Sequence, residues 1–137
     1  MLAKAPLSRR GSLTVELLLL LPVLILIVLA AIELSQMVSV NQRLQAASEQ
    51  AARAASQGAD SEEIARVARQ VLGKGALANA EIKAKWLDDH GRPLPSGELV
   101  EVVVSIPAKK AVPDFLRVVG FGLANKTLSG RTAMRKE

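Results

Sequence analysis

One uninterrupted apolar segment near the N-terminus limits the folds open to this chain of 137 residues. Sixteen residues, Leu17 to Ile32, lie between two glutamates without a polar or charged side chain, and thirteen of them are Leu, Ile or Val. As a helix they would rise about 24 Å, and counting from Ser12 extends this to about 31 Å, close to the ~30 Å hydrocarbon thickness of a bilayer. A helix on the core of a soluble protein carries a polar stripe, which this segment lacks. The sequence therefore predicts one membrane-spanning helix.

The net charge of +5 is concentrated ahead of this segment. The three leader cations are Lys4, Arg9 and Arg10. Residues 1–11 contain no acid, and the first cation after the apolar segment is Arg43. The rest of the chain has fifteen Lys and Arg against thirteen Asp and Glu, an ordinary surface balance that argues against nucleic-acid binding. By the positive-inside rule, we expect the N-terminus to stay cytoplasmic and the bulk of the chain to lie across the membrane.

The composition argues against most enzyme classes. The chain has no cysteine, which excludes disulfides, thiol nucleophiles and Cys-ligated metals, and its one histidine is His90. His90 follows Asp88 and Asp89 in a Gly- and Pro-rich stretch, where Asp side chains typically cap turns. Two carboxylates and an imidazole on consecutive residues do not easily converge on one ion. We therefore expect no cofactor, no metal and no small-molecule substrate, and an enzyme with a periplasmic catalytic domain stays a weaker alternative.

The residues around the start of the apolar segment form a processing motif. Gly11 directly follows two arginines, and Glu16 lies five residues beyond it. This spacing resembles a type IV prepilin site, in which the peptidase cuts after the glycine and the glutamate becomes the fifth mature residue. Over residues 9–36, Arg-Arg-Gly, Val-Glu-Leu, Leu-Leu-Pro-Val-Leu and Ile-Glu-Leu follow in that order. This stretch resembles the TadE family of pseudopilin-like proteins from the tight-adherence pilus system, although Leu17 stands where that family commonly has an aromatic residue.

The resemblance implies a minor pseudopilin that serves assembly of a tight-adherence (Flp-type) pilus or a related secretion filament and is not an enzyme. A prepilin peptidase would cut between Gly11 and Ser12 at the cytoplasmic face and remove the leader cations. The new amine of Ser12 would then pair with Glu16 of a neighbouring subunit. The implied partners are the bilayer, the peptidase, other pilins or pseudopilins and the secretion machinery. The implied localisation is the bacterial inner membrane, which the chain would cross once. The C-terminal domain would then lie in the periplasm, outside the cell or in the pilus.

Several other interpretations stay open. In one alternative, the chain is an unprocessed single-pass membrane-anchored protein whose periplasmic domain binds a partner or ligand. The N-terminus would be a secretory signal peptide if Val28-Leu29-Ala30 is a cleavage site. Glu16 would be incidental if its carboxylate only snorkels to the membrane interface. In a separate interpretation, Pro22 does no more than bend the helix, since a proline is tolerated in a membrane helix where neighbours satisfy the freed carbonyl.

Residues 12–57 are predicted to form one helix, because no Gly or Pro occurs from Glu33 to Gln57. The helix is apolar first and amphipathic afterwards. Its second half carries an apolar stripe at helical spacing, made of Leu34, Met37, Leu44, Ala47, Ala51 and Ala55. These small side chains allow close packing, so we expect the stripe to contact the C-terminal domain or another subunit.

Residues 58–137 predict a small extracytoplasmic domain, which makes the fold class α+β. A helix is expected from the Asp60 N-cap to Gly73, a hairpin of strands at 82–86 and 100–106, a short helix at 114–119 and a last strand. Its sheet would be roughly three-stranded and antiparallel. Lys109 and Lys110 are expected to guard a sheet edge. The expected core comprises Ile64, Val67, Val71, Ile82, Ala84, Trp86, Val100, Val102, Val104 and Ile106, with Leu128, Thr132 and Met134 on one side of the last strand.

Overall fold

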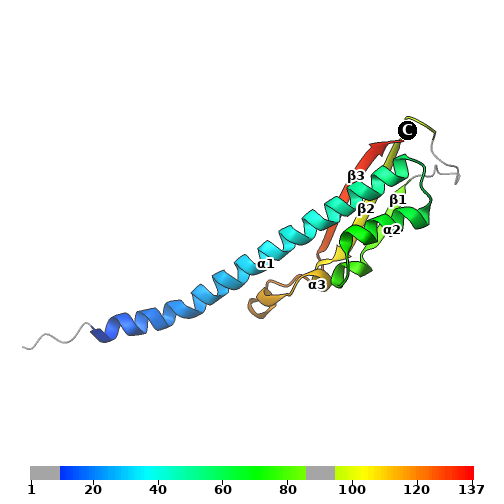
Figure 1. Ribbon diagram of the computed structural model, residues 1–137. Coiled ribbons are helices and arrows are strands. Elements are labelled where there is room, and N and C mark those ends of the chain that lie inside the picture. The colour runs from blue at the N-terminus through cyan, green and yellow to red at the C-terminus, as the bar shows by residue number, and fades with distance from the viewer. Residues whose placement is uncertain (1–9, 86–94) are drawn as a thin grey trace, which may run out of the picture.

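The computed structural model describes residues 10–85 and 95–137, with the side chains of the first helix described from residue 13 onward. Figure 1 shows a long helical rod with a small domain built around one end. The elements are α1 (Arg10–Ser56), α2 (Ser61–Leu72), η1 (Ala76–Asn79), β1 (Glu81–Lys85), β2 (Leu99–Pro107), α3 (Ala108–Ala111), η2 (Phe115–Val119) and β3 (Thr127–Arg135). The predicted α+β class, with one long N-terminal helix and a three-stranded sheet, is confirmed.

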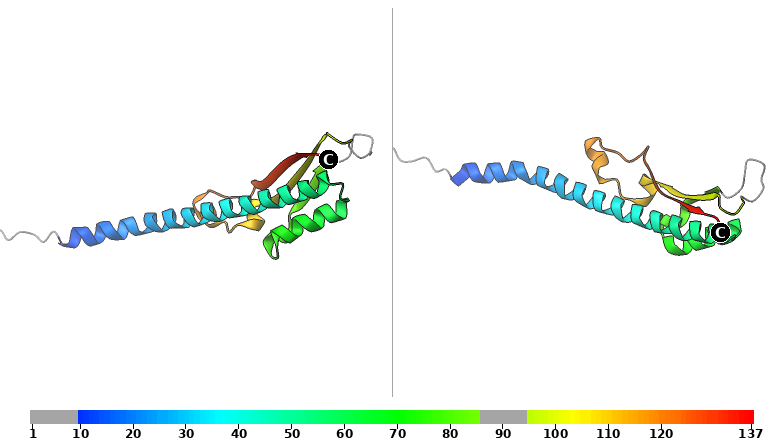
Figure 2. Two further views of the ribbon diagram at one scale, coloured as in Figure 1. Left: turned by 45° about the horizontal axis from the view of Figure 1, so that its top comes forward. Right: turned by 90° about the horizontal axis from the view of Figure 1, so that it is seen from above.

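Helix α1 has 47 residues, which corresponds to about 70 Å at 1.5 Å per residue. Pro22 lies inside it without ending it, although proline has no N–H to donate to the carbonyl of Leu18. The helix is continuous and curves gently along its length (Figure 2). The rod predicted for residues 12–57 is therefore present, beginning two residues earlier and ending one residue earlier.

The sheet has the order β1-β2-β3, and both strand pairs are antiparallel. In the central strand, Val104 pairs with Ile82 on one side and with Gly130 on the other. Alternate residues of β2 are fully buried, namely Val100, Val102, Val104 and Ile106. This alternation confirms the strand phase expected from the sequence. Trp86, placed in the expected core, lies outside the described residues, as do Asp88, Asp89 and His90.

The core lies between one face of the sheet and the second half of α1. Helix α1 contacts β2, β3 and α2, while α2 reaches β1 (Figures 1 and 2). The buried residues of α1 are mostly small, so the sheet and α2 approach its backbone closely; they include Val40, Leu44, Ala47, Ala51, Ala52 and Ala55. The prediction that the Ala-rich half of the helix closes the domain's core is confirmed. The domain consequently has no complete core without α1.

The structure corrects three expectations. Leu34 is 61% exposed and does not belong to the packed stripe, because it faces away from the domain, whereas its neighbour Glu33 is buried. Helix α2 buries Ile64, Ala68 and Leu72, four residues apart, whereas Val67 is half-buried and Val71 is exposed. Ala68 allows the two helices to approach, so α2 is rotated relative to the expected face.

Lys109 and Lys110 lie in the short helix α3 and guard no strand edge. The 3-10 helix η1 was also not expected.

The α2 N-terminus follows its sequence signal. Asp60 has an extended backbone, and its side chain accepts a hydrogen bond of 2.7 Å from the backbone N–H of Glu63. This bond satisfies one of the N–H groups that a helix start leaves unpaired. The N-cap predicted at Asp60 is confirmed.

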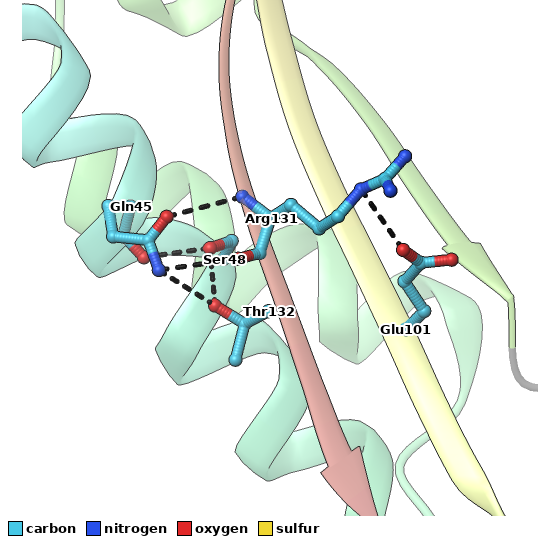
Figure 3. A network of polar contacts seen from close by, with 5 residues as sticks. All are labelled: Gln45, Ser48, Glu101, Arg131 and Thr132. Atoms are coloured by element: carbon cyan, nitrogen blue, oxygen red, sulfur yellow. Dashed lines mark hydrogen bonds and ion pairs between the residues drawn. The ribbon is translucent and has the colours of Figure 1, made fainter.

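A polar network joins α1 to the outer edge of β3 (Figure 3). The Gln45 side chain accepts from the N–H of Arg131 at 3.2 Å and donates to the C=O of the same residue at 3.3 Å, as a neighbouring strand would. The hydroxyls of Ser48 and Thr132 lie 2.8 Å apart, and Arg131 reaches across to Glu101 at 3.0 Å. The bonds made by Gln45 and Ser48 fix the position of β3 along the helix, and those of Gln45 occupy part of a strand edge that would otherwise be open to pairing.

Close contact between β3 and α1 depends on a glycine. A Cβ atom added at Gly130 would overlap with the backbone of Leu44 and Gln45 on α1. Any side chain at this position would therefore push strand and helix apart. Gly130 is the residue before Arg131, so this close contact lies beside the hydrogen bonds between the Gln45 amide and the Arg131 backbone.

Candidate functional site

The first half of α1 is covered by no other part of the described chain. Every side chain from Leu13 to Val28 is exposed, and the most apolar window of the helix, with a mean hydropathy of 3.1, is 0% buried. Within residues 10–85 and 95–137 this is the one helix long and apolar enough to cross a membrane. A core helix of a soluble protein would be mostly buried, and an apolar surface of this size is rarely left in water. The segment is a membrane anchor.

The expected processing site lies at the very start of this helix. The backbone of Gly11 and Ser12 is helical and belongs to the first turn of α1, which begins at Arg10. The first four N–H groups of a helix have no acceptor within it. Opening the chain at the Gly11–Ser12 bond therefore breaks few backbone hydrogen bonds. Lys4 and Arg9 lie outside the described residues.

Glu16 is exposed on the membrane-spanning half of α1. It stands four residues after Ser12, so both positions fall on the same helix face, separated by about 6 Å along the axis. Within the described part of the chain, no hydrogen bond or ion pair involves the Glu16 carboxylate. A carboxylate at this depth is costly without a partner. The geometry leaves it open to a group from outside the described chain.

Glu33, at the other end of the apolar segment, has a very different environment. It is only 2% exposed, and its Oε2 atom accepts hydrogen bonds of 3.1 Å from the backbone N–H groups of both Phe115 and Leu116. These residues begin η2, where N–H groups lack partners within the helix. Glu33 thus attaches the η2 segment to α1 at the level where the apolar segment ends.

Sequence reasoning noted Glu33 as the residue that closes the apolar segment and did not find its role. The available signal was a carboxylate in the Ile-Glu-Leu triplet, in a place where charge is expensive. Its partners are 82 and 83 residues away in the sequence and are backbone groups, which no residue pattern reveals.

Replacing Glu33 with alanine should release η2 from the helix. Hydrogen bonds to a charged acceptor contribute about 1.5–3 kcal/mol, which corresponds to at least roughly tenfold faster exchange of the amides it protects. We expect this increase at Phe115 and Leu116 when hydrogen exchange of the full chain is followed by NMR in micelles. Glu49→Ala, an exposed change on the same helix, serves as the control. Equal exchange rates in both variants would contradict the attachment.

Metal chemistry has no visible basis in the described residues. Among them, no group of three or more His, Cys, Asp or Glu side chains could hold a metal ion. The cluster weighed in the sequence, at residues 88–90, belongs to the stretch outside the description.

The comparisons with known proteins concern the helix. The family model of TadE-like proteins matches residues 11–53, which begin at Gly11 and cover α1 almost to its end. No curated protein and no solved structure matches the chain. The matched stretch contains the uncovered apolar segment, Glu16 and Glu33, so the resemblance drawn from the N-terminal motif is confirmed. Along residues 11–53 the chain is similar to TadE-like proteins, and its one described helix that is long and apolar enough to span a bilayer fits a pilus-associated membrane protein anchored near its N-terminus.

Proposed function

We propose that the chain is a minor pseudopilin, made as a precursor, that takes part in assembly of a tight-adherence pilus or a related secretion filament. A prepilin peptidase cuts the precursor between Gly11 and Ser12. The observation that carries the proposal is the match to TadE-like proteins, which starts at Gly11 and runs along an apolar helix that the rest of the described chain leaves uncovered. Such a helix is suited to contact lipid first and other subunits later.

Processing changes the charge at the membrane. Residues 1–11 form the leader, and their removal takes away the three leader cations that hold the N-terminus on the cytoplasmic side. It also creates an amine on Ser12. In the bilayer, an amine and a carboxylate are each strongly unfavourable alone and much less so as a pair. Cleavage therefore produces the partner that the open Glu16 carboxylate needs.

The pairing can set the register between subunits. The amine of a neighbouring chain meets Glu16 only when the two helices have a defined axial offset, since each charge lies at one height on its helix. Residues 12–57 act in this proposal as the rod, and residues 58–137 as an extracytoplasmic domain built on the end of that rod. The alternative of an unprocessed anchored binding protein predicts a mature chain eleven residues longer.

Glu16→Gln tests the assembly role. Glutamine keeps the shape and one acceptor but removes the charge, so we expect near-normal cleavage and a loss of at least tenfold in surface pili. Both quantities are measured in the same strain, as precursor size on a gel and as sheared pilus yield. Glu49→Gln makes the same change at an exposed site on the part of α1 beyond the apolar segment and should leave both unchanged. Normal cleavage together with normal pili would reduce Glu16 to a snorkelling residue.

A further inference from the structure

The loop between α3 and β3, residues 112–126, exposes large apolar side chains. Val118 is 91% exposed and Phe121 73%, and Val119 and Phe115 are exposed as well. Both phenylalanines of the chain lie in this loop. Elsewhere on the domain, the described residues show only isolated exposed apolar side chains such as Leu99 and Val71. A gathered apolar patch of this kind marks a surface that meets something other than water.

The loop holds its apolar side chains in a defined shape. The Asp114 carboxylate accepts from the N–H of Leu123 at 3.2 Å and so joins the two ends of the loop. The N–H of Phe121 bonds to the C=O of Leu116 at 3.1 Å, around Gly120 in a left-handed conformation. Leu123 is buried while the tip faces outward. The exposure of Val118 and Phe121 is therefore a feature of a hydrogen-bonded turn.

The patch lies at the height where the apolar segment of α1 ends. The Glu33 carboxylate bonds to the first two residues of η2, and Glu33 directly follows Ile32. In Figures 1 and 2 the loop, coloured orange, is the part of the domain that lies beside the middle of α1, on the side toward its apolar half. If Leu13–Ile32 span the hydrocarbon, the loop tip is placed in the interfacial layer of the same bilayer.

Exposed basic residues flank the patch along the sequence. From α3 to the start of β3 there are four cations, Lys109, Lys110, Arg117 and Lys126, all exposed, and the one acid is Asp114. One oxygen of that carboxylate is bonded within the loop. Exposed apolar side chains close in sequence to several cations are the composition of segments that lie in a membrane interface among anionic head groups.

We propose that the 112–126 loop inserts Val118, Val119 and Phe121 into the bilayer interface and that the exposed cations in and next to the loop face anionic lipid head groups. The loop is then a second membrane contact beside α1. The position of the patch beside the end of the membrane-spanning segment and the excess of exposed cations in the same stretch of sequence favour lipid over another protein. The proposal depends on membrane anchoring and not on cleavage or on a role in a pilus.

The test uses the full chain, which has no native cysteine. Val118→Cys carries an environment-sensitive fluorophore, and the chain is reconstituted at one copy per nanodisc of three parts phosphatidylcholine to one part phosphatidylglycerol. Leu99→Cys is the matched control, since Leu99 is also apolar and 67% exposed but pairs with Arg135 at the other end of the sheet. We expect spin-labelled lipid to quench the label at residue 118 at least threefold more than the label at residue 99, and aqueous iodide to quench it less.

Two outcomes would overturn the proposal. Equal lipid quenching at the two positions would show that the loop stays in water. Shielding of residue 118 from iodide that arises only with several copies per disc, without quenching by lipid, would make the patch a contact between subunits. A second variant, Phe121→Cys, should behave like Val118→Cys if the whole tip inserts. Because the assay contains no peptidase and no other pilin, its result is independent of the proposed function.

Discussion

Gly130→Ala is expected to lower the free energy of unfolding by about 3 kcal/mol or more, because the new methyl group would overlap with the α1 backbone at Leu44. Backbone atoms cannot rotate away as a flexible side chain does, so β3 must move off the helix. That movement also breaks the bonds between Gln45 and Arg131. For a domain of this size, the loss corresponds to a drop in melting temperature of roughly 12–24 °C, measured by circular dichroism of the full chain in micelles.

The chain offers a matched control for this variant. A Cβ atom added at Gly122 would meet the Asp114 carboxylate at 3.8 Å and the Arg117 side chain at 3.9 Å, which are ordinary contacts. Gly122→Ala should therefore change the melting temperature little. If Gly130→Ala melts like Gly122→Ala, the sheet does not pack on α1 as closely as described.

Gly11→Leu is expected to abolish maturation, if the peptidase needs a small residue before the bond that it cuts. The full-length precursor should accumulate, still carrying the leader cations, whereas N-terminal sequencing of the wild-type mature chain should begin at Ser12. Ser8→Leu, a comparable increase in size within the leader, is the control and should mature normally.

Sequencing also separates the competing interpretations of the N-terminus. A mature chain that begins near Ala31 would support a signal peptide and refute the prepilin site. Such a cut would fall inside the continuous helix α1, where Leu29 and Ala30 are already half-buried. A chain that keeps Met1 in a strain with an active peptidase would support the unprocessed anchor.

The parts of the fold that follow from local patterns were predictable. An apolar segment without a polar stripe, an alternating valine strand and an Asp N-cap each depend on neighbours in the sequence, and all three are present in the structure. The inward face of α2 was not predictable in the same way. Its apolar residues cover a broad arc, so periodicity fits Val71 about as well as Ala68. The choice depends on how closely α1 approaches, which only the packed structure decides.

In the candidate site, too, some features depend on neighbours in the sequence and others on tertiary contacts. The glycine and glutamate near the N-terminus are recognisable because their spacing along the chain is itself the motif. The role of Glu33 depends on backbone N–H groups contributed by η2, and the apolar loop becomes notable only once it lies beside the end of the apolar segment. Both are products of tertiary contact between distant parts of the chain.

Because α1 continues from the apolar segment into the domain core, any axial shift or rotation of its membrane end also moves the domain. The helix is unbroken from Leu13 to Ser56, and the sheet packs on its second half, where Leu44 is buried and Gln45 bonds to β3. If a helix shifts by one residue relative to a neighbouring helix while keeping the same path, it moves about 1.5 Å along its axis and rotates by about 100°. A neighbouring subunit that fixes the height and the rotation of the membrane-spanning end of α1 therefore also fixes the orientation of the sheet, which lies some tens of ångströms away along the same helix.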